Sequence, residues 1–179
     1  MRTPYDRGVY VGRFQPLHLG HMECIRYVLY RCREIIVVIG SAQASHTLEN
    51  PFTAGERVEM IRLALQENNV DLNKFIIVPV EDTVNNNHSI WVSKVRSLIP
   101  KFNVVFTNSP LTKRLFEEEK IKVEGIPYIN RQRFSGTIIR RMIIEGDEGW
   151  KELVPKSVYE YIIEIKGDER LKELAKKDI

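Results

Sequence analysis

Two histidines three residues apart, His18 and His21, are the first residues of the chain whose types and spacing could do chemistry. They follow the short apolar run 8–12 in the stretch GVYVGRFQPLHLGH, and Arg13 lies between that run and the pair. A spacing of three lets both imidazoles face one side of a helix that begins near His18. A loop that enters a helix also offers free N–H groups, and Arg13 could add a guanidinium fork, so the stretch predicts a phosphate-binding site.

The two histidines could instead belong to a metal site, act as a general base, or only pack and cap a helix. A zinc site needs further ligands, but the other two histidines, His46 and His88, are isolated and no HExxH pattern occurs. We therefore expect no metal ligands in the chain. Packing, capping, general-base catalysis and phosphate binding stay open at this point.

A second group of candidate residues lies in the stretch RQRFSGTIIRR, residues 131–141. Ser135 is a candidate N-cap, and Gly136 and Thr137 would open the helix that follows. Backbone N–H groups, the two hydroxyls and the guanidinium of Arg140 could converge on a polyphosphate. The alternative is a capped amphipathic helix with a basic face in solvent.

The bulk properties limit the classes of partner. The chain has 179 residues, 43% of them hydrophobic and 28% charged, and its net charge of +3 is spread along the sequence. Without basic tracts, this composition favours a small anionic substrate over nucleic acid. No apolar run approaches membrane-spanning length and no signal peptide is recognisable, so we expect a cytoplasmic protein without a membrane partner.

The two cysteines agree with that location. Cys24 and Cys32 fall in one predicted helix, where eight residues correspond to about 12 Å along the axis. That separation is too large for a disulfide, so we expect both thiols to be reduced.

Alternating strand-like and helical patterns predict the scaffold that positions these residues. Apolar, β-branched runs predict strands at 8–12, 34–40, 75–80, 103–108 and, more weakly, 121–126. Amphipathic patterns predict helices at 20–32, 53–65, 89–99 and 110–119, with a capping box of Thr53 and Glu56 and with Pro110 in a first turn. This order predicts an α/β fold with a doubly wound parallel sheet, helices on both faces and ligands beyond the carboxyl ends of the strands.

From Gly136 onward the pattern is helical, in three segments at 136–146, 156–166 and 168–177. The sequence shows no repeat, linker or shift in composition. We expect one domain over 1–179, made of an α/β sheet core (1–130) and a small C-terminal helical subdomain (131–179) packed on the sheet.

Taken together, the motifs resemble those of a known superfamily. The element GRFQPLHLGH with the distant SGTIIR resembles the HxGH and SxTxxR-type signatures of the nucleotidyltransferases. The segment GSAQASHTLENPFTAGERVEMI (40–61), the IW pair at 90–91 and SGTIIRRMI are similar to the archaeal-type nicotinamide-nucleotide adenylyltransferases, and the resemblance covers nearly the whole chain. It implies a Rossmann-like nucleotidyltransferase fold and the reaction of ATP with nicotinamide mononucleotide (NMN) to give NAD and pyrophosphate.

The chemistry of that reaction agrees with the residue types. The attacking group would be the NMN phosphate, which is already ionised at pH 7, so no general base is needed. Catalysis can rest on positioning and on neutralising the charge that develops at the α-phosphate and the leaving pyrophosphate. Mg²⁺ is the implied cofactor, bridging phosphate oxygens with few protein ligands.

The resemblance also implies roles for single residues. The catalytic set would be Arg13, His18, His21 and Arg140, with His21 nearest the reacting α-phosphate. The residues of the ATP site would be Gly12, Arg13, Phe14, His18, Gly20, His21, Asn108, Ser135, Thr137 and Arg140. At Gly20 a Cβ would obstruct the adenosine part of ATP.

The implied NMN site consists of Gly40, Ser41, Asn87, His88 and Trp91. Ser41 belongs to a GSAQ turn that follows the second strand. Trp91 would stack on the nicotinamide ring, where a positive pyridinium favours an aromatic face. The alternative for Trp91 is a buried core tryptophan.

The chain departs from the family pattern in the loop 81–91 and in the turn 107–110, and Arg57 has two possible roles. In the loop EDTVNNNHSIW (81–91), His88 stands where an amide-recognising asparagine is expected, so either Asn87 or His88 reads the carboxamide. The turn TNSP (107–110) lacks an expected glycine, and we expect Asn108 to take the left-handed conformation there. Arg57 could be a structural ion-pair residue or a ligand.

Other functions were weighed against this one. They are transfer to a pantetheine phosphate or flavin acceptor, a non-catalytic NAD sensor, and a nucleic-acid module based on Arg131, Arg133, Arg140 and Arg141. The histidine pair with Arg140 favours an enzyme, and Trp91 with the GSAQ turn favours nicotinamide. The resemblance further implies a homo-oligomer, with a hexamer as one form.

Overall fold

The computed structural model describes residues 3–127 and 133–177. The chain forms two compact units, each assembled from three segments. We call them the sheet unit (Met1–Gly12, Cys24–Ala42 and Asn73–Pro127) and the helical unit (Arg13–Glu23, Gln43–Leu72 and Tyr128–Ile179). The predicted single domain with a division near residue 130 stays a prediction.

The sheet unit is built on a parallel sheet of five strands in the order β3-β2-β1-β4-β5. The strands are β1 (Tyr5–Gly12), β2 (Cys32–Ile39), β3 (Phe75–Pro79), β4 (Val104–Phe106) and β5 (Val123–Glu124). All five predicted strands are present, and the predicted doubly wound parallel α/β class is confirmed. The order reverses between β1 and β4, so the carboxyl end of β1 is the switch point where ligands of such sheets bind.

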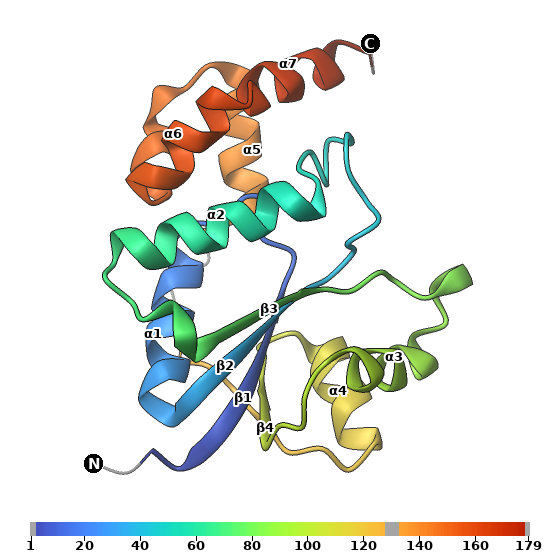
Figure 1. Ribbon diagram of the computed structural model, residues 1–179. Coiled ribbons are helices and arrows are strands. Elements are labelled where there is room, and N and C mark those ends of the chain that lie inside the picture. The colour runs from blue at the N-terminus through green and yellow to red at the C-terminus, as the bar shows by residue number, and fades with distance from the viewer. Residues whose placement is uncertain (1–2, 128–132, 178–179) are drawn as a thin grey trace. The chain divides into compact units, whose positions relative to one another are not determined.

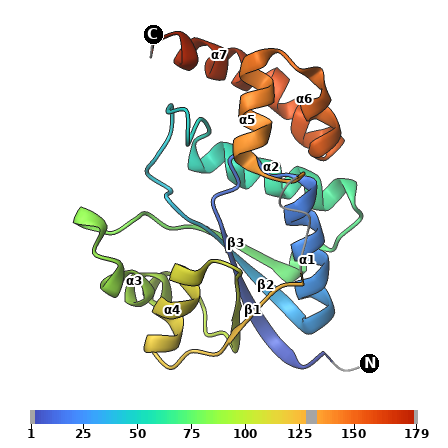
Figure 2. The same cartoon turned by 180° about the vertical axis from the view of Figure 1, so that it is seen from behind.

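Helices cover both faces of this sheet. α1 (Leu19–Arg31), whose residues from 24 onward belong to the sheet unit, lies on one side, and α3 (Trp91–Leu98) and α4 (Pro110–Glu118) lie on the other (Figure 1 and Figure 2). A buried apolar cluster joins the α3 and α4 face to the strands, with Val9, Val38, Trp91, Val95 and Phe116 among its members. This burial explains the nearly unbroken apolar runs of the strands.

One boundary differs from the prediction. The predicted helix at 20–32 ends at Arg31, and Cys32 is the first residue of β2, where it pairs with Tyr5. The Cys32 side chain fits beside Gly8, whose added Cβ would lie 2.6 Å from the sulfur. Pairing in the sheet therefore overrides the helical pattern, and the two free cysteines lie in different elements.

The helical unit contains α2 (Ala54–Glu67), α5 (Gly136–Glu145), α6 (Lys156–Glu164) and α7 (Gly167–Lys177). α2 contacts α6, and α7 contacts both α5 and α6 (Figure 1). The three predicted C-terminal helices are thus present. Among the described residues, no helix is long and apolar enough to cross a membrane.

The start of α2 is fixed by the predicted capping box. Glu56 N donates to Thr53 Oγ1 over 3.2 Å, and Thr53 N donates to Glu56 Oε2 over 2.9 Å. The Glu56 carboxylate also accepts two 2.8 Å hydrogen bonds from the guanidinium of Arg170 in α7. The capping box and the paired charges therefore fix the segment before α2, which the functional loop described below depends on.

We predict that Thr53→Ala lowers the free energy of unfolding by about 1 kcal/mol, because the first turn of α2 loses its side-chain acceptor. Thr53→Ser is the matched control, since it keeps the hydroxyl and should stay close to the parent protein. Denaturant unfolding at constant slope measures both. An equal loss in the two variants would mean that packing of the threonine methyl, not the cap, is what matters.

Candidate active site

The predicted site residues fall into two groups, one in each unit. The helical unit holds Arg13, Phe14, His18, Gly20, His21, Ser135, Thr137 and Arg140, the residues predicted to bind phosphate. The sheet unit holds Gly12, Gly40, Ser41, Asn87, His88, Trp91 and Asn108. The first group contains every residue of the predicted catalytic set.

The two histidines form a stacked pair at the start of α1. Their ring centroids lie 3.6 Å apart, with 24° between the planes. His18 N donates to His21 Nδ1 over 3.1 Å, and His21 N donates to His18 Nδ1 over 3.3 Å. Because each Nδ1 accepts a hydrogen bond, the proton of each neutral ring sits on Nε2. The pair therefore offers two Nε2–H donors to an anion.

Burial keeps both rings uncharged. It lowers the pKa of His18 to about 4. It also lowers the pKa of His21 well below its ordinary value, and the neighbouring His18 adds to that effect. At neutral pH the pair acts through hydrogen-bond donation, and a bound polyanion would favour its protonated form.

Phe14 lies against the pair and has an unusual backbone. Its φ of 53° is in the left-handed region, which bulky residues rarely adopt. Its buried ring lies 4.8 Å from the ring of His21, centroid to centroid. The strained residue therefore forms part of the surroundings that orient His21.

Arg140 joins α5 to the histidine loop. Its Nη1 donates to Gln15 O over 2.7 Å, and its Nη2 donates to Thr137 Oγ1 over 3.3 Å. Burial lowers the pKa of Arg140, and the nearby positive charge of Arg13 lowers it further, while Glu49 acts in the opposite direction. Two guanidinium groups that disfavour each other's charge make an electropositive site, which suits an anionic ligand.

Gly20 has a packing role that was not predicted, and Ser135 lacks the predicted capping hydrogen bond. A Cβ at Gly20 would lie 2.8 Å from Phe134 Cβ and 3.1 Å from the ring of His18, so packing within the chain already requires glycine there. Clearance for adenosine stays a prediction. Ser135 occupies the N-cap position of α5, but its side chain makes no capping hydrogen bond.

In the sheet unit, the predicted GSAQ turn lies at the carboxyl ends of the strands. Gly40 N donates to Gly12 O over 2.9 Å, which brings the ends of β2 and β1 together. Ser41 follows with a left-handed φ of 48°, and Ala42 N donates to Val80 O over 3.1 Å. The turn therefore lies at the edge where parallel sheets of this kind bind ligands.

Trp91 is a core residue of the sheet unit in this structure. It is 9% exposed, and its ring lies edge-on to Phe116 with centroids 6.0 Å apart. Its Nε1 is buried without a hydrogen-bond partner in the described part of the chain. Stacking on nicotinamide stays a prediction, and the location agrees with the alternative that we left open.

The loop before Trp91 exposes both candidates for reading the carboxamide. Asn87 and His88 lie between and within two short 3₁₀ turns, Val84–Asn86 and His88–Ile90, and both residues are exposed. Asn87 O accepts from Thr83 Oγ1 over 2.7 Å, which anchors the middle of the loop. Nothing in this geometry favours one candidate over the other.

The prediction for Asn108 is wrong. Asn108 does not take a left-handed conformation. Its amide instead pairs with the backbone of Ile126, donating to the carbonyl over 2.9 Å and accepting from the N–H over 2.9 Å. This side-chain pairing continues the contact between β4 and β5 beyond the strand ends, and it leaves the adenine contact as a prediction.

Two polar residues behind the histidine loop were not assigned from the sequence. Arg57 is fully buried and donates from Nη1 to Arg13 O over 3.0 Å, so it contacts the backbone of the histidine loop. Gln15 exchanges two hydrogen bonds with the backbone of Phe52, at 2.8 and 2.9 Å. Only their places within the two motifs could have pointed to them.

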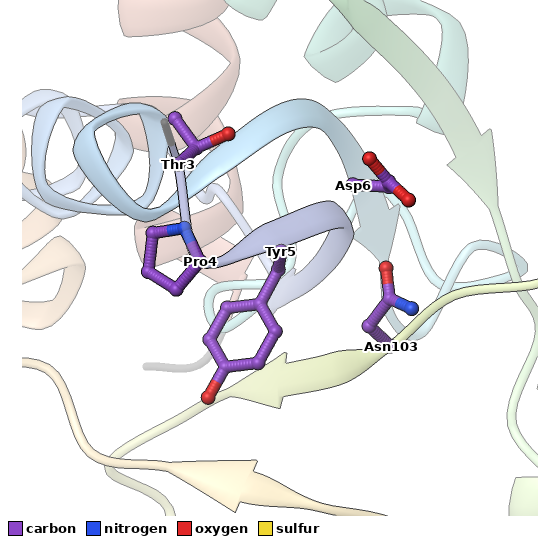
Figure 3. Close-up of a pocket in the computed structure, with 5 residues that line it drawn as sticks. All are labelled: Thr3, Pro4, Tyr5, Asp6 and Asn103. Carbon is purple, nitrogen blue, oxygen red and sulfur yellow. The ribbon is translucent and has the colours of Figure 1, made fainter. Parts of the chain in front are cut away.

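A surface depression lies at the opposite edge of the sheet, at the amino end of β1. Figure 3 shows the residues that line it: Thr3, Pro4, Tyr5, Asp6 and Asn103. None of them belongs to the predicted site. Arg131, one of the arginines weighed for nucleic acid, lies outside the described residues.

Comparisons with known proteins agree with this geometry. The model of the cytidylyltransferase-like family matches residues 9–142. The nicotinamide-nucleotide adenylyltransferase of Saccharolobus solfataricus is 52% identical over 97% of this chain and 99% of its own. The enzyme of the same name from Pyrococcus horikoshii is 50% identical over 94% of this chain and 89% of its own.

Solved structures share the fold. The bifunctional NMN adenylyltransferase/ADP ribose pyrophosphatase of Francisella tularensis matches 94% of this chain with a TM-score of 0.77 and 22% identity. A structure of the same description, complexed with AMP and a manganese ion, matches 97% with a TM-score of 0.76 and 24% identity. The present chain spans about half the length of that bifunctional protein, 53% in both comparisons. With a family model matched over most of its length and relatives that share half of its residues, the chain belongs to the cytidylyltransferase-like family, alongside the nicotinamide-nucleotide adenylyltransferases.

Proposed function

We propose that the protein transfers the adenylyl group of ATP to NMN, giving NAD and pyrophosphate in NAD biosynthesis. The observation that carries the proposal is the stacked, uncharged histidine pair beside Arg13 and Arg140. This arrangement provides two neutral donors and two cations on one loop and the helices α1 and α5, which suits a polyphosphate. The relatives at about 50% identity carry the name of this activity.

The residues act by binding and positioning. An oxygen of the ionised NMN phosphate attacks the α-phosphorus of ATP, and the bond from that phosphorus to the bridging oxygen breaks as pyrophosphate leaves. His18 and His21 donate from Nε2 to phosphate oxygens, with His21 at the α-phosphate. Arg13 and Arg140 neutralise the charge that moves toward the leaving group.

The metal ion enters as part of the ATP substrate, for which we propose Mg²⁺. The described residues contain no group of three histidine, cysteine, aspartate or glutamate side chains that could hold a metal ion. Ser135 and Thr137 would offer hydroxyl oxygens near the phosphates, and a bound Mg²⁺ would neutralise phosphate charge there with few ligands from the protein. The manganese ion in the Francisella protein supports a divalent cation.

We assign the remaining site residues as follows. Gly12, Phe14, Gly20 and Asn108 complete the ATP site, and Gly40, Ser41, Asn87, His88 and Trp91 form the NMN site. The placement of Gly12 and Gly40 at the carboxyl ends of β1 and β2 supports this division. The choice between Asn87 and His88 would decide whether nicotinic acid mononucleotide is also accepted.

We also propose a cytoplasmic homo-oligomer, with a hexamer as one form. Two free thiols support a reducing compartment. Large apolar side chains are exposed among the described residues of the sheet unit, and they include Tyr30, Val84, Ile90, Leu98 and Leu111. Exposed apolar surface of this kind supports contact with further copies of the chain.

The deciding experiment is an assay of pyrophosphate release with ATP and a panel of acceptors. The panel contains NMN, nicotinic acid mononucleotide, pantetheine phosphate and flavin mononucleotide. We expect turnover with NMN and formation of NAD. Tight NAD binding without turnover would identify a sensor instead, and turnover with another acceptor would identify a different transferase.

We predict that His21→Ala lowers kcat by about 100-fold or more and changes the KM for ATP by less than about threefold, because its donor matters most in the transition state. Glu23→Ala, at an exposed position of the same helix, is the control and should leave both parameters near those of the parent enzyme. Equal losses in kcat and ATP affinity would assign His21 to ground-state binding.

We predict that Trp91→Phe raises the KM for NMN about threefold to tenfold and leaves the KM for ATP unchanged, because a smaller ring stacks less well on nicotinamide. Phenylalanine is chosen over alanine because Trp91 fills part of the core. An unchanged KM for NMN in the folded variant would make Trp91 a core residue only.

The uncharged state of His18 predicts a loss of stability at low pH. Its folded pKa of about 4 lies below its ordinary value of 6.5, so the unfolded chain binds more protons between these values. We predict that the free energy of unfolding falls as pH drops from 6.5 to 4, on the order of 3 kcal/mol from this residue. His18→Asn, which cannot titrate, should show that much less of the decline in denaturant titrations, whereas parallel curves would contradict the burial argument.

A further inference from the structure

Hydrogen bonds connect the loop that carries the histidine pair to the segment 52–57. We propose that Gln15 and Arg57 are positioning residues that lock Phe14 in its strained conformation and thereby orient the imidazole of His21. They act through His21 and not by touching substrate. The inference rests on the proposed role of His21 in adenylyl transfer.

Phe14 is the link between the loop backbone and His21. With φ at 53°, the Cβ of Phe14 is crowded by the neighbouring carbonyl. A phenylalanine side chain forms no local hydrogen bond that could offset this strain. Strain of this kind persists only where the surroundings over-determine it. In this conformation the buried Phe14 ring lies 4.8 Å from the His21 ring, centroid to centroid.

Hydrogen bonds fix the backbone on both sides of Phe14, and we call these two sets of bonds grips. Before it, the carbonyl of Arg13 accepts from Arg57 Nη1 over 3.0 Å. After it, Gln15 Nε2 donates to Phe52 O over 2.8 Å, and Phe52 N donates to Gln15 Oε1 over 2.9 Å. Both grips come from the same short segment, so they fix the path of the chain through the left-handed residue.

An arginine that only filled space at position 57 would lower the stability of the fold. The Arg57 side chain is fully buried and lies in the first turn of α2, where the helix dipole opposes a positive charge. A buried cation is costly unless its donors are bonded. The hydrogen bonds that the guanidinium donates to Arg13 O and, from Nε over 3.2 Å, to Thr53 O offset part of this cost, and they are bonds that an apolar side chain could not make.

The variants Arg57→Met and Gln15→Met test the inference, since each replaces the hydrogen-bonding group of one grip with an apolar, unbranched side chain. Arg62→Met is the matched control, because Arg62 lies on the same helix and forms a partly exposed ion pair with Glu59. For each variant, kcat and both KM values are measured by NAD formation. The Cε1–H signal of His21 is followed by NMR in the protein without ligand.

We expect Arg57→Met and Gln15→Met to lower kcat about tenfold or more while the KM for NMN stays within about twofold, because misplacement of the donor costs mainly the transition state. The His21 signal should move as the Phe14 ring shifts. Arg57→Lys, which retains one donor toward Arg13 O, should recover part of kcat. Arg62→Met should match the parent protein in every readout.

A folded Arg57→Met variant with the kcat and the His21 signal of the control would overturn the inference. Should that variant fail to fold, Gln15→Met decides by the same two readouts. Failure of the proposed function is a separate result, because the parent enzyme itself would then form no NAD. The His21 signal would still report whether the two grips orient the ring.

Discussion

The path of the chain from Arg13 to His21 is the constraint on which the site depends. It has to bury two imidazoles against each other, keep both uncharged and leave their Nε2 atoms as donors. Burial alone would disfavour any polar ring, but each Nδ1 accepts a backbone N–H, so neither ring loses that hydrogen bond. The electropositive character of the site is supplied by the guanidinium groups of Arg13 and Arg140.

The helical unit supplies the frame for this path. Arg170 of α7 holds the Glu56 carboxylate and also donates to Pro51 O over 2.9 Å, while Glu56 closes the capping box with Thr53. The backbone of 51–57 is thereby fixed by groups far along the chain. That rigidity is what makes it a usable template for the histidine loop, since a hydrogen bond to a mobile segment could not maintain strain at Phe14.

Local signals explain which features were predictable from the sequence. Apolar β-branched runs, the Thr53–Glu56 box and Pro110 at the first position of α4 each depend on neighbours in sequence, and each occurs as expected. The start of β2 at Cys32 and the amide pairing of Asn108 depend instead on partners in other strands. The same holds for the loop grips, whose partners lie 37 and 44 residues away and leave no periodic pattern. The resemblance predicts which residues bind phosphate, but a family motif does not reveal what holds them in place.

The two groups of site residues differ in how completely the protein has ordered them. On the phosphate side, His18, Phe14 and Arg140 are buried and hydrogen-bonded or stacked before any ligand arrives. On the proposed acceptor side, Asn87 and His88 are exposed, between and within two short 3₁₀ turns. A group that is ordered in advance costs little entropy on binding, whereas exposed turn residues lose conformational freedom when they close on a ligand. With the roles proposed above, selection of the acceptor has to offset an ordering cost that phosphate binding does not meet. Changes in the 81–90 loop are then expected to alter acceptor preference without disturbing the phosphate chemistry.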